Sequence, residues 1–416
     1  MDYRRNIICI DLKSFFASCE CVERNLDPFK VNLVVADPDH EGSITLAVTP
    51  AMKKLGVPSR GRVYAIPKTI NYIIVKPRMS LYLKKSQEVV NIYLDFVSSD
   101  DLHVYSIDEV FMDVTDYLNY HKLNDYELAL KILKTIKEKT GLTATCGIGP
   151  NMLLAKIAMD VEAKHNKDCI AKWDYHDIKD KLWNIKPLSK MWGIGSAMER
   201  NLNILGINSV YDLAHYDKNK LKIKFGVMGE ELWNHANGID MSRISDFKKL
   251  PQDISYSHSQ ILHKDYHENN IKIIIKEMIE LLTARLRKNN KMCNVIGFGI
   301  GYSRNFGGGF YHSMKLSASS DNTDDIYKVC SMMFDDYYDF TPIRKVSISL
   351  GKLTKKIGTQ LSIFDDPEEI IKKNKLDRTI DEIKDNFGKN TILKASALLS
   401  DSTIKERNEK IGGHSA

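Results

Sequence analysis

The stretch that decides the fold is YSIDEVFMD, residues 105–113, which carries two adjacent carboxylates, Asp108 and Glu109. Apolar strand-forming residues flank the pair on both sides, so the sequence predicts two strands joined by a turn with the acids at its crest. Adjacent carboxylates repel, and each raises the pKa of the other unless a cation lies between them. An isolated Asp-Glu step is more often a solvated turn, so a metal site needs a further acid.

That further acid follows the N-terminal apolar run NIICI, residues 6–10, which ends on Asp11. The run predicts a buried strand that delivers a carboxylate to the end of a sheet, and a helical pattern follows over residues 12–20. Three carboxylates at the tips of neighbouring strands, Asp11, Asp108 and Glu109, suit a two-metal phosphoryl-transfer site. Oxygen ligands favour two Mg²⁺ ions, with Mn²⁺ as a substitute, over zinc.

At this point the chain resembles a known family, the Y-family translesion DNA polymerases, in the UmuC-like branch of the catalytic subunit of bacterial DNA polymerase V. The resemblance runs nearly end to end and rests on the order and spacing of five segments. They are DLKSFFASCE (11–20), YSIDEVFMD (105–113), CGIGPNMLLAKIAMDVEAK (146–164), WGIGSAMERNLNILGINSVYDLA (192–214) and QLSIFDD (360–366). The resemblance implies DNA-directed DNA synthesis opposite damaged template bases, error-prone and mutagenic, in DNA repair and the SOS response.

The fold class implied by the resemblance is α+β and multidomain, a right-hand polymerase with a ferredoxin-like palm. The expected parts are the palm (1–13 and 80–168), small fingers (14–79), a helix-hairpin-helix thumb (169–245), a linker (246–253), a little finger (254–353) and a tail (354–416). Hydrophobic periodicity alone predicts the order β-α-β-β-α-β for the little finger, with helices near 269–287 and 324–337.

The resemblance also assigns roles within the active site. It gives metal binding to Asp11, the backbone carbonyl of Leu12, Asp108 and Glu109. It makes Phe16 the steric gate that excludes a 2′-hydroxyl. Without the family, Phe16 would be an ordinary core aromatic, and Phe15 is expected to be the core residue of the pair.

The expected nucleotide-binding residues are Phe15, Phe16, Lys53, Arg60 and Lys164. Lys53 stands where the family usually has a triphosphate-binding Arg, and Pro50 where many relatives have a Tyr. Lysine still acts as a point charge on phosphate, but it lacks the bidentate fork of arginine. Lys156 lies about two helical turns before Lys164, so spacing does not separate them; the family match favours Lys164.

DNA contacts are expected in two places. The turn containing Gly193 and Gly195 would let backbone N–H groups at a helix start approach a phosphate, giving a grip that is independent of sequence. A plain helical connector is the alternative reading of this turn. In the little finger, Arg285, Arg287 and Arg304 are candidate phosphate contacts, although each could be ordinary surface charge.

The tail carries a short motif that resembles the pentapeptide by which bacterial polymerases dock on the sliding clamp. Its residues are Gln360, Leu361, Ser362, Ile363 and Phe364. The glutamine would offer hydrogen bonds while the apolar side chains fill a pocket. The alternative is an amphipathic strand that packs on its own domain.

Composition is compatible with this reading without deciding it. The chain has 416 residues, too many for one core, and 60 basic against 54 acidic residues give a net charge of +6. Because no apolar run approaches the length of a membrane span and no signal peptide is recognisable, a cytoplasmic protein is expected. Its expected partners are primer-template DNA, deoxynucleoside triphosphates and the sliding clamp. The need for an accessory subunit or a recombinase filament stays open. The competing hypothesis is a clamp-tethered DNA-binding factor whose polymerase centre is inactive or accessory-dependent.

Overall fold

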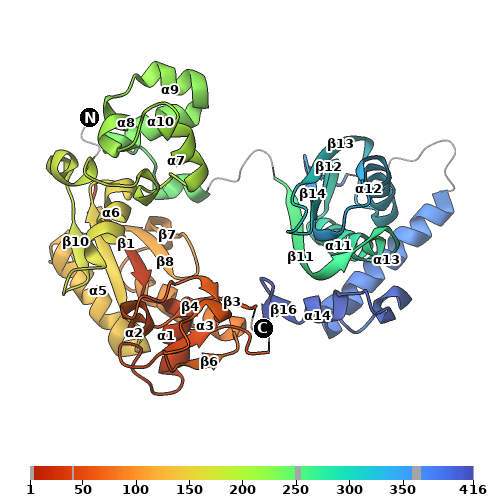
Figure 1. The fold of residues 1–416 in the computed structure, drawn as a ribbon, viewed down its shortest axis with the longest axis horizontal. Helices are drawn as coiled ribbons and strands as arrows, with labels where there is room; N and C mark the ends of the chain where they lie inside the picture. The colour runs from red at the N-terminus through yellow and green to blue at the C-terminus, as the bar shows by residue number, and fades with distance from the viewer. Residues whose placement is uncertain (1–3, 40–41, 249–253, 358–366, 416) are drawn as a thin grey trace. The chain divides into compact units, whose positions relative to one another are not determined.

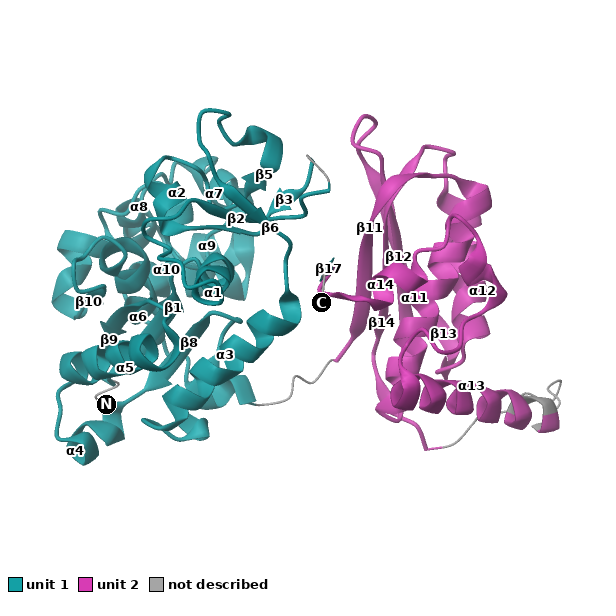
Figure 2. Ribbon diagram, turned by 90° about the horizontal axis from the view of Figure 1, so that it is seen from below, with its two compact units in different colours: residues 1–250, 414–416 teal, residues 251–413 magenta. Residues whose placement is uncertain are grey.

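The chain divides into two units, residues 1–250 with 414–416 and residues 251–413 (Figure 2). The structure is a computed structural model that describes residues 4–39, 42–248, 254–357 and 367–415. Within the described residues, no helix combines the length and the apolar character that crossing a membrane demands.

The palm of the first unit is built on a five-stranded sheet. Its order is β10-β9-β1-β8-β7, and the bounds are β1 (Ile7–Leu12), β7 (Leu102–Val104), β8 (Glu109–Asp113), β9 (Ala144–Gly149) and β10 (Ile170–Lys172). β1 pairs antiparallel with both β8 and β9, so the N-terminal strand is central. Because β10 pairs parallel with β9, the palm sheet includes residues up to Lys172, four residues beyond the predicted palm boundary at residue 168.

Side chains alternate along β1 and β8, so each face of this sheet packs against a different hydrophobic core. On one face, Ile8 and Ile10 pack in a cluster with residues of α3 (Met79–Leu94) and α5 (Asp125–Thr140). On the other face, Cys9 and Phe111 pack with residues of α6 (Met152–Ala158). Since side chains alternate along a strand, Asp11 and Glu109 share this second face with Cys9 and Phe111.

Local signals in the sequence define these helices. An Asn124–Glu127 capping box starts α5, and Gly141, in the left-handed conformation with φ 73°, ends it. α6 continues into a π-turn over Met159–Ala163. In the fingers, Pro50 occupies the first turn of α2 (Pro50–Lys54), where a missing N–H costs no helical hydrogen bond.

The fingers and the thumb consist of short elements. The fingers contain α1 (Phe15–Val22), the sheet β4-β2-β6 and the pair β3-β5, with bounds β2 (Leu33–Val35), β3 (Ile44–Thr45), β4 (Ala47–Val48), β5 (Gly61–Arg62) and β6 (Ile73–Val75). The thumb contains α7 (Ser196–Asn203), α8 (Val210–His215), α9 (Lys218–Phe225) and α10 (Val227–Ala236) (Figure 1).

The second unit has the predicted order β-α-β-β-α-β. Its elements are β11 (Tyr256–Tyr266), α11 (Glu268–Lys288), β12 (Lys291–Tyr302), β13 (Gly309–Ser320), α12 (Thr323–Tyr337) and β14 (Ile343–Gly351). The strands form the order β11-β14-β12-β13, and β15 (Thr354–Lys355) pairs with β12. Both helices lie on one face of this sheet (Figure 2).

The tail as far as residue 413 folds with the second unit, whereas residues 414–416 group with the first. Its elements are α13 (Pro367–Phe387), α14 (Ile404–Asn408), β16 (Lys410–Ile411) and β17 (His414–Ser415). Arg287 and Lys288 of α11 pair with Asp381 and Asp385 of α13, at 2.6 Å and 2.8 Å. Helix α13 is therefore part of this unit's packing.

The predicted linker is also corrected in part. Phe247 stacks on His103 of β7 with ring centroids 4.1 Å apart, and Lys248 Nζ lies 2.6 Å from Asp100 Oδ1. Residues 246–248 are thus held against the palm, because an aromatic ring and a cation in this polar stretch find palm partners. Residues 249–253 lie outside the described residues.

Candidate active site

The three predicted carboxylates meet at one end of the palm sheet. The register of β1 and β8 sets Asp11 directly opposite Glu109. Asp108 lies in the turn before β8, and its carbonyl accepts a hydrogen bond of 2.9 Å from the N–H of Leu12. Neighbouring antiparallel strands place opposed side chains on the same face, so the pairing itself brings two distant acids together.

Two lysines of the following helix face these carboxylates. Lys156 Nζ lies 2.6 Å from Glu109 Oε1, and Lys164 Nζ lies 3.0 Å from Asp11 Oδ2. The Lys156 side chain is 8% exposed and that of Glu109 is 12% exposed, so their pair is well buried. The Lys164 side chain is 40% exposed, which leaves its ammonium accessible from solvent.

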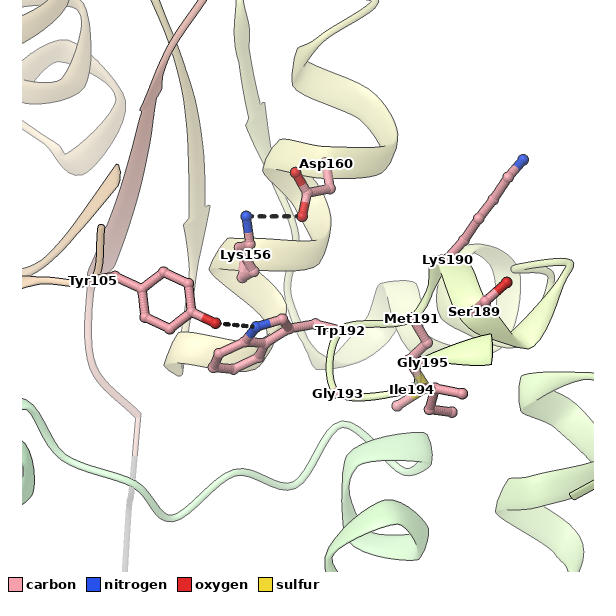
Figure 3. Close-up of a pocket in the computed structure, with 10 residues that line it drawn as sticks. All are labelled: Tyr105, Lys156, Asp160, Ser189, Lys190, Met191, Trp192, Gly193, Ile194 and Gly195. Atoms are coloured by element: carbon pink, nitrogen blue, oxygen red, sulfur yellow. Dashed lines mark hydrogen bonds and ion pairs between the residues drawn. The ribbon is translucent and has the colours of Figure 1, made fainter. Parts of the chain in front are cut away.

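Asp160 connects the two lysines and was not singled out from the sequence. Its carboxylate lies 3.0 Å from Lys156 Nζ (Figure 3) and 2.7 Å from Lys164 Nζ. The signal was visible, since Lys156, Asp160 and Lys164 follow one another at intervals of four residues. The π-turn at Met159–Ala163 changes the helical pitch at this point, and such turns are frequent at functional sites.

Burial and charge act against each other in this cluster. Burial raises the pKa of Asp11, and the ammonium of Lys164 opposes that rise without cancelling it. Burial likewise raises the pKa of Glu109, against the opposing charge of Lys156. Burial disfavours the charged form of Lys156, but Asp160 and Glu109 outweigh it, and the pKa of Lys156 is raised.

The carboxylate oxygens of this site suit a hard divalent cation, although the side chains of Asp11 and Glu109 face lysines. Carboxylate oxygens from Asp11, Asp108 and Glu109 are ligands that Mg²⁺ and Mn²⁺ accept. Across the described ranges, no three His, Cys, Asp or Glu side chains converge as a ready-made metal site. Asp108 Oδ1 accepts a hydrogen bond of 2.7 Å from the hydroxyl of Ser106. A cation bound here would compete with Lys164 for Asp11 and with Lys156 for Glu109.

The two phenylalanines at the start of α1 differ in burial. Phe15 is 3% exposed and belongs to the core, as expected for that member of the pair. Phe16 is only partly buried and stacks on Tyr82, with ring centroids 4.6 Å apart and an interplanar angle of 23°. The Tyr82 ring thus fixes the plane of Phe16 while part of that ring stays accessible.

The basic residues of the fingers differ in their relation to the carboxylates. Lys53 lies in the last turn of α2, and burial lowers its pKa, while the charges of Asp11 and Asp108 raise it in opposition. Those interactions place Lys53 within electrostatic reach of the acids. Arg60 is exposed just before β5.

The thumb turn has the openness that the sequence predicted. Gly193 has φ 90°, and a Cβ added at Gly193 or Gly195 would meet nothing within 4 Å. Gly195 caps the N-terminus of α7, an eight-residue helix. Unobstructed backbone at a helix start can approach a phosphate closely.

The three candidate DNA-binding arginines of the little finger differ in their exposure and in their partners. Arg304 and Arg285 are exposed, the latter stacked over the Tyr256 ring at 4.2 Å. Arg287 is 10% exposed, and its Nε and Nη2 bind both oxygens of Asp381 at 2.6 Å and 3.1 Å. This arrangement contradicts the prediction of a DNA contact for Arg287, because a helix about ninety residues later covers the guanidinium.

The predicted clamp-binding residues Gln360, Leu361, Ser362, Ile363 and Phe364 lie outside the described residues. That prediction is therefore untouched by the structure.

Comparison with known proteins gives matches along most of the chain. Residues 10–160 match the impB/mucB/samB family, and residues 254–363 match the C-terminal domain of the same family. Residues 189–240 match the thumb domain of DNA polymerase-iota.

Full-length relatives are also similar. A putative UV-damage repair protein, UvrX, of Bacillus subtilis is 40% identical over 415 residues, covering 99% of this chain and 98% of that protein. DNA polymerase IV of Clostridium acetobutylicum is 32% identical over 413 residues, covering 97% and 99%. The solved structure of a Y-family DNA polymerase chimera superposes with a TM-score of 0.66 at 22% identity, covering 84% of this chain and 99% of that one.

Proposed function

The chain belongs to the impB/mucB/samB family of Y-family DNA polymerases and is a DNA-directed DNA polymerase of translesion synthesis, and we propose that it works by two-metal nucleotidyl transfer. The observation that carries this proposal is the pairing of β1 with β8, which sets Asp11 opposite Glu109 beside Asp108. In the reaction, the primer 3′-oxygen bonds to the α-phosphorus of the incoming nucleotide while the bond to pyrophosphate breaks.

Each polar group of the site then has a role. Asp11, Asp108, Glu109 and the Leu12 carbonyl would hold two Mg²⁺ or Mn²⁺ ions. When bound, the cations supply activation of the 3′-hydroxyl and charge neutralisation at the leaving pyrophosphate. Lys164, accessible beside Asp11, binds the triphosphate when that carboxylate turns to a cation.

The fingers complete the nucleotide pocket. Lys53 adds a second positive charge for the triphosphate, and Arg60 is a further candidate on the exposed side. Phe16, stacked on Tyr82, would act as the steric gate that excludes a ribose 2′-hydroxyl.

Outside the active site, phosphate contacts are assigned to the Gly193–Gly195 turn, Arg285 and Arg304. The sliding clamp would engage Gln360 to Phe364, and synthesis without it would be distributive. We further propose that the protein is cytoplasmic, takes part in the SOS response and belongs to the UmuC-like branch. Dependence on an accessory subunit or a recombinase filament is decided by adding each to the assay.

The test is primer extension with Mg²⁺ and single deoxynucleotides on undamaged and abasic templates, with and without clamp. Asp108→Ala combined with Glu109→Ala should abolish extension while primer-template binding persists. Asp116→Asn, an exposed acid of the same palm, is the control and should extend normally. A wild-type protein that binds DNA but never extends, with clamp present, would favour the non-catalytic DNA-binding factor instead.

A further inference from the structure

A pocket lies between the palm and the thumb of the first unit (Figure 3), and one of its lining residues, Lys156, is the ion-pair partner of Glu109. Its volume is about 510 Å³, and it is lined by Tyr105, Lys156 and Asp160 from the palm and by thumb residues 189–195. The pocket therefore joins the lysine side of the active site to the turn to which phosphate binding is assigned.

Trp192 bridges the two walls of this pocket. Its indole Nε1 donates a hydrogen bond of 3.3 Å to the Tyr105 hydroxyl, and the two rings meet edge to face with centroids 6.0 Å apart (Figure 3). On its palm side the indole also packs on Phe111, with centroids 5.8 Å apart. Phe111 is fully buried, so this contact has little freedom to shift.

Both palm partners of Trp192 belong to the hairpin that carries the acids. Phe111 lies two residues beyond Glu109 on β8 and therefore on the same face of the sheet. Tyr105 donates its backbone N–H to the Glu109 carbonyl at 2.9 Å. Trp192 is thus connected to Glu109 by two short chains of contacts, one through Tyr105 and one through Phe111.

On the thumb side, Trp192 immediately precedes the Gly193–Gly195 turn. Its ring lies parallel to that of His235 in α10, with centroids 6.5 Å apart. Its neighbours Met191 and Ile194 are buried in the thumb core, which fixes the turn to the same rigid cluster. Trp192 therefore connects the proposed phosphate grip to the carboxylate hairpin.

We propose that Trp192, held by the Tyr105 hydroxyl, is a positioning residue that sets the spacing between the thumb turn and the palm carboxylates. The primer strand lies across the pocket, and this spacing places its 3′ end against Asp108 and Glu109. The inference rests on the proposed function. Lys156 is neutralised by Glu109 and Asp160, so the exposed Lys190 supplies the positive charge of the lining that a phosphodiester backbone could meet.

A purely structural role for Trp192 makes different predictions. If the indole only fills space, its replacement lowers the folded stability and leaves the reaction unchanged. If it positions the primer terminus, replacement lowers the rate of nucleotide addition at saturating nucleotide, because a small misplacement of reacting atoms is costly. The affinities for nucleotide and for primer-template DNA stay constant in that case.

The experiment compares Tyr105→Phe, Trp192→Phe and the double variant, each of which removes the hydrogen bond and keeps an aromatic ring at the position. The matched control is Trp233→Phe, whose indole donates to the Tyr216 carbonyl at 3.0 Å within the thumb. Single-turnover rates, nucleotide and DNA dissociation constants and melting temperature are measured. A fluorescent base analogue at a dideoxy-terminated primer end reports its placement without turnover.

We expect each single variant to add nucleotide about five-fold more slowly, the effect of one neutral hydrogen bond. The double variant should be no slower than either single one, because both remove the same contact. The base-analogue signal should change in all three, and Trp233→Phe should behave as wild type.

Unchanged rates and signal, or a double variant slowed by the product of the single effects, would overturn the inference. The same loss in Trp233→Phe would also overturn it. A wild-type protein unable to extend primers would instead overturn the proposed function on which it rests.

Discussion

At the scale of single residues, the active site is a set of charges that share one buried region. Asp11 and Glu109 each face a lysine, and Asp160 holds both lysines in place. Because opposite charges stabilise one another, the pKa shifts of Asp11, Glu109, Lys156 and Lys164 depend on the charges of their neighbours. A substitution that removes one of these charges should therefore be compared with one that keeps the shape of the side chain.

Lys53 supplies a first prediction at this scale. Lys53→Ala should raise the dissociation constant for the incoming nucleotide about ten-fold, the loss of roughly 1.4 kcal/mol of attraction to phosphate. Lys53→Arg should bind at least as tightly as wild type, because guanidinium forms bidentate contacts with phosphate. Pre-steady-state nucleotide titration measures both, with the exposed neighbour Lys54→Ala as control. Equal effects of Lys53→Ala and Lys54→Ala would remove Lys53 from the nucleotide pocket.

Glu20 supplies a prediction about pH. Its side chain is fully buried on α1 and accepts hydrogen bonds from Arg78, Tyr82 and Arg24. Burial raises its pKa, but the hydrogen bonds outweigh burial, so the pKa lies below the usual 4.5. The carboxylate therefore stabilises the fold above about pH 4.5, and this contribution is lost as the pH falls through the lowered pKa.

Glu20→Gln should lower the free energy of unfolding by about 2 kcal/mol at pH 7, the range for hydrogen bonds to a charged group. The difference from wild type should shrink as the pH falls below 4.5, since only the wild-type side chain gains a proton. Urea unfolding at several pH values measures it, with Glu23→Gln as a partly exposed control. A difference independent of pH would contradict the assignment.

At the scale of elements, the active site depends on how closely α6 approaches β9. Gly147 and Gly149 face that helix, and a Cβ at Gly147 would lie 1.9 Å from the Ala155 carbonyl oxygen and 2.5 Å from the Met159 nitrogen. Both clashes are with main chain, which cannot rotate away. The two glycines thus permit the packing that brings Lys156 over Glu109.

Gly147→Ala should therefore destabilise the first unit by about 3 kcal/mol, the upper range for overpacking. It should also slow nucleotide addition, because α6 must move and Lys156 moves with it. Gly195→Ala is the control for stability, since a Cβ there meets nothing within 4 Å. Chemical unfolding and single-turnover extension measure the two effects. Normal stability of Gly147→Ala would mean that β9 and α6 can separate freely.

At the scale of the whole molecule, the tail as far as residue 413 is part of the second unit. Arg287 binds Asp381 through two nitrogens and lies 3.6 Å from Asp377, which fastens α13 to the end of α11. The Arg287 side chain is only 10% exposed, and it holds Asp381 through two hydrogen bonds. This ion pair is therefore stronger than one on the open surface.

Arg287→Ala should thus lower the stability of the second unit by about 2 kcal/mol, because two carboxylates lose their partner. It should leave the salt dependence of DNA binding unchanged. Arg304→Ala should do the reverse, with wild-type stability and a salt slope smaller by about one unit. Thermal unfolding and DNA binding at several salt concentrations separate the two. A smaller salt slope of DNA binding in Arg287→Ala would instead indicate that Arg287 contacts phosphate.

The sequence by itself determined the features that depend on neighbours in the chain. The hairpin at residues 105–113, the strand ending on Asp11 and the order β11 to β14 follow from hydrophobic period and turn chemistry, which are local. The open Gly193–Gly195 turn was predictable for the same reason.

Only the tertiary structure decided which distant side chains meet. Lys156 pairs with Glu109 and Lys164 with Asp11, a choice that helical spacing left open. Arg287 is engaged by a helix about ninety residues later, and Trp192 meets Tyr105 across 87 positions. Such contacts follow from strand register, close helix packing and the docking of one element on another, and no local pattern in the chain specifies them.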